Sequence, residues 1–278
     1  MRHSLSCRKS WPSNVPTIEL ARLKQETASL SEHFSEPATY LRGLEHLLQN
    51  YAMPVHRQGQ VKGMRPVLRS YEIPPPLLKH LQIELAEQAR EAPQAALAVA
   101  DGLWARRTIE TRQLAARLLG AIVASPQELI ARLESWADEN YEPILAPELA
   151  QQATLNLNVR HPEELILFAR RLLASGQVRK QAFALGALRT LLDGTQFANL
   201  PAIFEILSEV ARVADRKLRP DLAALLVALA QRSPKETEYF IEQGLESGAN
   251  PGLQWVARRV MKALPADSQE RLRTILKA

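Results

Sequence analysis

The polar junction that begins at Trp136 carries side chains suited to recognising a cationic group. Three carboxylates, Asp138, Glu139 and Glu142, follow this tryptophan within six residues. A cation is stabilised when it lies against an aromatic face beside a negative charge, so Trp136, Asp138 and Glu142 are candidates for a binding or catalytic site. The alternative interpretation is structural: Asp138 or Asn140 caps the next helix, and Trp136 packs into the core.

A second feature is a cluster of cations on a segment rich in glycine and proline. Within thirteen residues that contain no acid, the cluster holds Arg57, Lys62, Arg65 and Arg69. A basic backbone of this kind can follow a phosphate chain, and each neutralised phosphate releases counterions. A solvated loop is the alternative interpretation.

Pairs of cations also recur near expected helix ends along the second half of the chain. They are Arg170 with Arg171, Arg179 with Lys180, Arg216 with Lys217 and Arg219, and Arg258 and Arg259 with Lys262. Equivalent positions of stacked units align on one face, so these pairs are candidates for a basic, DNA-binding track. Isolated surface arginines would give the same pattern.

Composition limits the remaining possibilities. The chain has 278 residues and a net charge of +5, with 46% hydrophobic but only 5% aromatic residues. It contains no GxGxxG, GxxxxGK[ST], HExxH, CxxC or GxSxG motif, and its six histidines are scattered. We therefore expect no metal and no cofactor. The single Cys7 has no partner for a disulfide, and no apolar run is long enough to span a membrane, so a cytoplasmic monomer is expected.

The elements that must position these residues are short amphipathic helices. Pro, Gly, Ser and Asn separate them, and no strand pattern is credible. A connection over 52–76, with three consecutive prolines, breaks the series. The expected helices span 17–33, 37–51, 77–92, 93–104, 109–124, 126–137, 143–157, 162–174, 178–192, 200–214, 218–231, 234–246, 252–263 and 268 to the end.

These helices are too short to bury their apolar faces alone, so neighbouring pairs must stack. Pairs recur every 30 to 45 residues or so, within the range of HEAT-like arrays, and no TPR or ankyrin consensus is present. The sequence thus predicts an all-α protein, a right-handed superhelical α-solenoid of HEAT-like helical repeats. We expect residues 17–278 to form one domain after a disordered leader at 1–16.

In order and spacing, several segments resemble the AlkD-type DNA alkylation-repair glycosylases over most of residues 40–265. The segments are YEIPPPLL at 71–78, Leu103-Trp104 with Glu110 and Arg112, Ser135-Trp136, and the run 178–229. The resemblance implies a concave basic groove that holds duplex DNA and releases cationic N3- or N7-alkylated purines. A carboxylate near the deoxyribose then stabilises the oxocarbenium character that develops as the base leaves.

The sequence departs from this family where the resemblance implies the catalytic acid. The family acid, four residues after Trp136, corresponds to Asn140, or to Tyr141 in an alternative register, so the nearest carboxylates are Asp138 and Glu142. The family arginine corresponds to Arg179 or Lys180, and a later family tryptophan falls near Leu225 or Leu226. Trp255 lies too far along the chain to be its direct counterpart.

Three functions remain at this point. The first is a DNA alkylation-repair protein that binds duplex DNA and has possible glycosylase activity, with Glu142 or Asp138 as the charge-stabilising carboxylate beside Trp136. Its DNA contacts would be Lys62, Arg65, Arg69, Arg179, Lys180, Arg216, Lys217, Arg258, Arg259 and Lys262. The second is a non-catalytic HEAT-repeat binder of unusual DNA structures. The third is a protein-interaction scaffold, which would expose an apolar patch.

Overall fold

The computed structural model describes residues 20–53, 68–139, 142, 145–193, 197–213, 215–246 and 251–277. Within these ranges the chain is helical, and its only β feature is an isolated bridge between Arg69 and Thr108. The α-helices are α1 (Leu20–Ser31), α2 (Pro37–Asn50), α3 (Pro75–Glu91), α4 (Pro93–Ala105), α5 (Ile109–Ala121), α6 (Pro126–Glu139), α7 (Ala146–Glu148), α8 (Leu155–Arg160), α9 (Pro162–Ala174), α10 (Val178–Asp193), α11 (Leu200–Val213), α12 (Arg219–Arg232), α13 (Pro234–Glu246), α14 (Pro251–Val260) and α15 (Ala266–Ile275). The all-helical class predicted from the sequence is confirmed.

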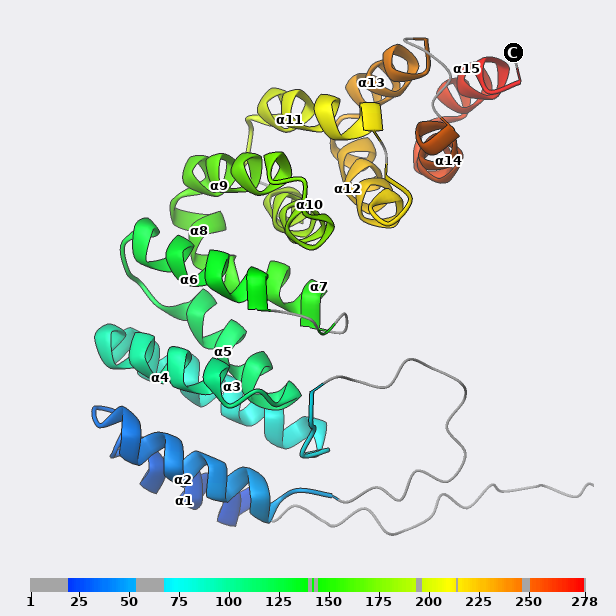
Figure 1. The fold of residues 1–278 in the computed structure, drawn as a ribbon. Helices are drawn as coiled ribbons and strands as arrows, with labels where there is room; N and C mark the ends of the chain where they lie inside the picture. Colours follow the sequence, from blue (N-terminus) through cyan, green and yellow to red (C-terminus); the bar gives the residue numbers. More distant parts are fainter. Residues whose placement is uncertain are drawn as a thin grey trace, which may run out of the picture.

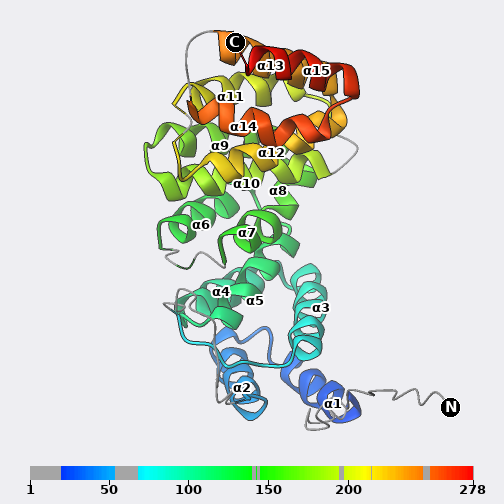
Figure 2. The ribbon, with the colours of Figure 1, turned by 90° about the vertical axis from the view of Figure 1, so that its right-hand side faces the viewer.

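The helices stack into a curved array with two rows in its second half. Helices α10, α12 and α14 pack in succession, and α9, α11 and α13 cover them from one side. Figure 1 shows α10, α12 and α14 inside the curve and α9, α11 and α13 along its outer rim. Figure 2 looks at the open side, where α14, α12 and α10 lie in front of the outer row.

The core that joins the units is aliphatic. Leucine and alanine fill most buried positions, including Leu77, Leu118, Leu188 and Leu226, all of which are fully buried. Each helix therefore buries its apolar stripe against its neighbours, which is the main source of stability for short helices. No helix in the described ranges is long and apolar enough to cross a membrane.

The chain between α6 and α9 differs from the expected single helix over 143–157. It forms the one-turn α7, a π-helical turn (Leu149–Ala153) and the short α8. Helix α5 approaches the π-helical turn so closely that a Cβ on Gly120 would lie 1.8 Å from the backbone oxygen of Gln152. Tight contact with α5, which a hydrophobic pattern does not record, accompanies the break.

Candidate functional site

Three neighbouring hollows line the inner side of the array. The N-terminal hollow, of about 770 Å³, lies between α2, the segment 68–71, the start of α5 and the end of α6. The central hollow, of about 380 Å³, lies between the α7 region and α10 and reaches the first turn of α12. The C-terminal hollow, of about 590 Å³, lies between α10, α12 and α14. The first two share Glu142 and the last two share Arg189, so the hollows form a continuous series, here called the inner wall.

Arginine is the cation of the inner wall. Among the described residues that line the three hollows are seven arginines, five carboxylates and no lysine. The arginines are Arg69, Arg106, Arg107, Arg112, Arg179, Arg189 and Arg259. Because the planar guanidinium donates in a fork that matches phosphate oxygens, an arginine-rich lining suits a phosphate chain.

A buried aromatic stack contacts Arg112 and Glu139, two residues that line the N-terminal hollow. The rings of Trp104 and Trp136 lie 4.6 Å apart at an interplanar angle of 7°, and both residues are only 3% exposed. The guanidinium of Arg112 lies 4.1 Å from the Trp104 ring centroid. Burial lowers the pKa of Arg112, an effect that the nearby Glu139 carboxylate opposes. The Trp104 indole N–H donates to the Glu139 carboxylate at 3.0 Å, which helps to fix a residue that lines the hollow.

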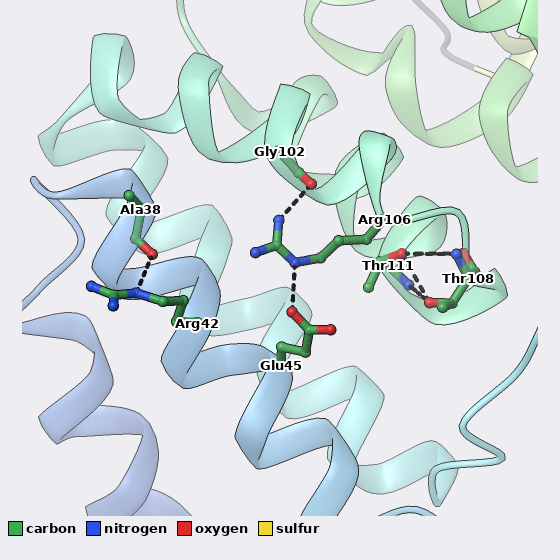
Figure 3. Close-up of polar contacts among 7 residues, drawn as sticks. All are labelled: Ala38, Arg42, Glu45, Gly102, Arg106, Thr108 and Thr111. Carbon is green, nitrogen blue, oxygen red and sulfur yellow. Dashed lines mark hydrogen bonds and ion pairs between the residues drawn. The ribbon is translucent and has the colours of Figure 1, made fainter.

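Two sets of polar contacts fix the rim of this hollow. Arg106 contacts the Glu45 carboxylate through Nε at 3.3 Å and donates from Nη1 to the Gly102 carbonyl oxygen at 2.8 Å (Figure 3). Thr108 and Thr111 form a reciprocal capping box at the start of α5, also drawn in Figure 3. The contact between Arg106 and Glu45 joins the end of α4 to α2, and the capping box fixes the start of α5.

The segment 68–72 is held against α5 by a buried carboxylate. Glu110 accepts a hydrogen bond from the Ser70 hydroxyl at 2.6 Å and another from the Glu72 backbone N–H at 2.9 Å. The Ile109 N–H donates to the Arg69 carbonyl oxygen at 2.9 Å, which extends the attachment. Glu110 therefore has a structural role, and Arg69 is placed at the edge of the hollow.

Glu142 occupies the boundary between the N-terminal and central hollows. Its side chain is 5% exposed, and it accepts a hydrogen bond from the Leu68 backbone N–H at 3.4 Å. It lines both hollows. A buried carboxylate at such a boundary has a fixed position, which electrostatic stabilisation of a reacting group requires.

Asp221 lines the central hollow from the first turn of α12. Burial raises the pKa of its carboxyl group. Arg179 and Arg189 of α10 line the same hollow, and Phe183 contributes to an otherwise mostly apolar surface. An apolar hollow with a few convergent charged groups, one of them with a perturbed pKa, is typical of a site of chemistry.

The structure brings some of the sequence candidates to this wall and not others. Trp136 packs into the core, as the structural alternative predicted, and it lines none of the hollows. Asp138 and Lys180, predicted to act separately, form an ion pair with 2.8 Å between Oδ1 and Nζ. The Lys180 side chain is only 14% exposed, so Asp138 neutralises a cation that was expected to contact phosphate.

Of the remaining cationic candidates, some line a hollow, some lie elsewhere on the surface, and some lie outside the described residues. Arg69, Arg179 and Arg259 line the N-terminal, central and C-terminal hollows respectively. Arg216 and Lys217 lie exposed in the turn before α12, and Arg258 and Lys262 are exposed near the end of α14, but these four line no hollow. Lys62, Arg65 and Asn140 lie outside the described residues.

The C-terminal hollow contains an exposed aromatic residue. Trp255 of α14 is 38% exposed, and the guanidinium of Arg259, one helical turn later, lies 5.9 Å from its ring centroid. Leu225 and Leu226, where the resemblance placed an aromatic residue, are fully buried in the core of α12. The exposed indole of this region thus comes from the next unit.

Sequence reasoning missed Asp221, Arg189 and the pair Arg106 and Arg107. Periodicity contains the signal for Arg189, because residues 179, 182, 186 and 189 follow the helical spacing of one face and all line the central hollow. Asp221 carried no such signal: next to Pro220 at a helix start it resembles an ordinary first-turn acid. Only the approach of α12 to α10 brings it to the hollow.

The described residues include no group of three or more His, Cys, Asp and Glu side chains that could hold a metal ion. Comparison with curated proteins and with solved structures finds no match for this sequence. The model of one protein family, described as DNA alkylation repair enzyme, matches residues 44–271. This match includes every described residue that lines the three hollows and most of the chain, so the protein belongs to the DNA alkylation repair enzyme family.

Proposed function

We propose that this protein binds duplex DNA along its inner wall and releases cationic N3- or N7-alkylated purines by hydrolysing the N-glycosidic bond. The observation that supports this most is the central hollow, which is bordered by the carboxylates of Glu142 and Asp221 and lined by Arg179 and Arg189. A right-handed superhelical path of the stack around the duplex belongs to the same proposal.

Glu142 is the better candidate for stabilising positive charge on the sugar. As the cationic base leaves, the deoxyribose gains oxocarbenium character, and a fixed carboxylate lowers the energy of that state. The hydrogen bond from Leu68 fixes Glu142, and its position at two hollows gives it access to a bound nucleotide. Asp138 is less suitable because Lys180 already balances its charge.

Asp221 is proposed as the general base. A carboxylate with a raised pKa accepts a proton from water more readily than an ordinary aspartate. Asp221 would orient the attacking water and take one of its protons, while Glu142 stabilises the charge that develops on the sugar. Glycoside hydrolases that cleave O-glycosidic bonds also divide two roles between two carboxylates.

Phosphate binding is assigned to the arginines of the inner wall. Arg69, Arg179, Arg189 and Arg259 come from four separate places along the wall, so together they would contact an extended backbone. Each phosphate contact that is lost reduces the salt dependence of binding by about one counterion.

Base release from a duplex that carries 7-methylguanine tests this proposal. We expect Glu142→Gln, whose amide oxygen still accepts the Leu68 N–H, and Asp221→Asn each to slow release about a hundredfold. Asp138→Asn is the matched control, because it removes a neighbouring carboxylate that lines no hollow, and its rate should remain within a few fold. If the unaltered protein releases no base at high protein concentration, the glycosylase proposal is wrong.

A non-catalytic DNA binder is the second candidate, favoured by Asn140 at the position where the resemblance implies an acid. This candidate predicts salt-dependent DNA binding without base release. Neutralising Arg189 with Arg189→Gln would then reduce the salt slope, while Asp221→Asn would leave it unchanged or strengthen binding, since it removes a negative charge.

A further inference from the structure

The C-terminal hollow has a composition that phosphate binding alone does not explain. Its floor consists of small apolar side chains of α12, Ala223, Ala224, Val227 and Ala228. The Trp255 indole forms part of its side, and its exposed fraction of 38% contrasts with 3% for Trp104 and Trp136. A phosphate chain needs neither an apolar floor nor an aromatic ring, so a second kind of group must be considered.

Charge and size together favour one kind of occupant. Arg189 enters from α10 and Arg259 from α14, while Asp193 is the only carboxylate among the described residues that line this hollow. The lining is therefore cationic as well as apolar and aromatic. A volume of about 590 Å³ lies within the range of sites for nucleotide-sized molecules. A flat ring attached to a phosphate matches these properties better than an apolar protein segment does.

We propose that the C-terminal hollow is a stacking subsite for an unpaired nucleobase of bound DNA. The base lies against the Trp255 indole and over the alanines of α12. Arg189 and Arg259 neutralise the phosphates on either side of it. The inference rests on the proposed function, since it requires DNA on the inner wall.

The chemistry of each residue supports this subsite. Every nucleobase has a π face, so stacking on an indole is strong and tolerant of sequence. Arg259 lies 5.9 Å from the indole centroid and adds a cation close to the stacked pair. Asp193 lines the same hollow and can accept a hydrogen bond from an N–H group on the edge of the stacked base.

The subsite also connects to the central hollow. Arg189 lines both hollows, so one phosphate contact serves a nucleotide in either place. An unpaired base beside a nucleotide held at Arg189 would therefore lie close to the C-terminal hollow. DNA with a weakened or missing pair should bind better than fully paired DNA for this reason.

The test uses the full chain and a duplex with 2-aminopurine as a single unpaired base, compared with the same duplex fully paired. We expect the protein to quench 2-aminopurine fluorescence only in the unpaired duplex and to bind that duplex about tenfold more tightly. Trp255→Ala should remove the quenching and reduce the preference to about one, and Trp255→Phe should retain part of both. Tyr239→Ala, which removes an exposed aromatic residue of α13 outside the hollow, should behave like the unaltered protein.

The outcomes separate the two proposals. If the protein binds both duplexes equally and without quenching, or if Trp255→Ala keeps the full preference, the stacking subsite is wrong and DNA binding on the inner wall stands. If the protein binds neither duplex at low salt, both proposals are overturned. A uniform loss of affinity in Arg189→Gln, with quenching retained at saturation, would support the division between phosphate and base contacts.

Discussion

Two pairs of tryptophan and arginine lie at different places along the array and differ mainly in burial. At the N-terminal hollow, Arg112 lies over Trp104, which stacks on Trp136, and all three residues are 3% exposed or less. At the C-terminal hollow, Arg259 lies beside Trp255, which is 38% exposed. The same two residue types therefore form part of the buried core in one region and part of an accessible surface in the other.

The difference shows that the environment of an aromatic residue decides its role. Trp104 and Arg112 use their polar groups on Glu139, through its carboxylate and its backbone carbonyl respectively. These contacts hold both side chains within the fold, although Arg112 Nε has no hydrogen-bond partner. Trp255 is 38% exposed, and small side chains of α12 line the same hollow. The first region should govern stability, and the second should govern recognition.

The largest expected effect is on stability and comes from Trp136→Ala. This change removes a fully packed indole and leaves a cavity beside Trp104, so it should lower the free energy of unfolding by about 3–5 kcal/mol. Urea denaturation monitored by circular dichroism measures this loss. Trp255→Ala should lower the same quantity by less, because more than a third of this residue is exposed. Equal losses in the two variants would contradict the division of roles.

A smaller loss in the free energy of unfolding is expected from Gly120→Ala, which tests how tightly α5 packs on the π-helical turn. The added Cβ would lie 1.8 Å from the Gln152 backbone oxygen, which cannot rotate away. Overpacking should outweigh the better helix propensity of alanine and cost about 2 kcal/mol, measured by thermal unfolding. Gly43→Ala is the matched control, because its Cβ meets only the end of the flexible Leu30 side chain, at 2.6 Å. A neutral Gly120→Ala would mean that α5 and the π-helical turn are not tightly coupled.

Backbone strain beside the N-terminal hollow gives a third, still smaller effect. Arg107 has a φ of 56°, in the left-handed region that favours glycine. The free energy of unfolding of Arg107→Gly should therefore exceed that of Arg107→Ala by about 1 kcal/mol, as measured by urea denaturation. Both variants lose the charge, but only glycine relieves the strain. Arg107→Ala thus controls for the loss of the arginine side chain in Arg107→Gly. No difference between the two would show that the strain is negligible.

Most of the fold could be predicted from the sequence because each helix carries its own signals. Pro126 and Pro234 follow serines that cap their helices, and α6 and α13 begin at these prolines as expected. The π-helical turn could not be predicted, since it depends on the approach of Gly120 to residues 149–153. Periodicity describes one helix, and this feature belongs to the contact between two.

The site was less predictable for the same reason. Glu142 was a candidate from its chemistry alone; it lines two hollows, and its catalytic role stays a prediction. Asp138 was chosen on the same grounds, yet it pairs with Lys180, 42 residues later in the chain. Packing between units decides which carboxylate pairs with a cation and which one borders a hollow. The hydrophobic pattern of a single sequence does not record that packing.

The smallest predicted effect concerns the polar contacts that hold α13 and α15 together near the exposed pair of Trp255 and Arg259. Glu238 of α13 accepts hydrogen bonds from Arg271, at 2.5 and 2.8 Å, and from the Ser268 hydroxyl, at 2.6 Å, both on α15. Helix α13 in turn packs on α14, which carries Trp255. These contacts of Glu238 with Arg271 and Ser268, here called the Glu238 latch, should therefore stabilise the C-terminal region and leave the Trp104–Trp136 region unaffected.

The acid dependence of the latch follows from the pKa of Glu238. The hydrogen bond from Arg271 lowers this pKa below its ordinary value of 4.5, although burial opposes the shift. The folded state thus holds the proton less firmly than the unfolded state, so the stabilisation is complete above about pH 4.5 and is lost as the pH falls through the lower, folded value. The neighbouring Glu242 opposes part of this loss, because burial and the charge of Glu238 raise the pKa of Glu242.

Hydrogen exchange between pH 5 and pH 3, corrected for intrinsic rates, should show reduced protection in α13 and α15 before any change in α5. Arg271→Gln should reduce that local pH dependence, and simultaneous loss of protection in α5 would show that the two regions unfold as one unit.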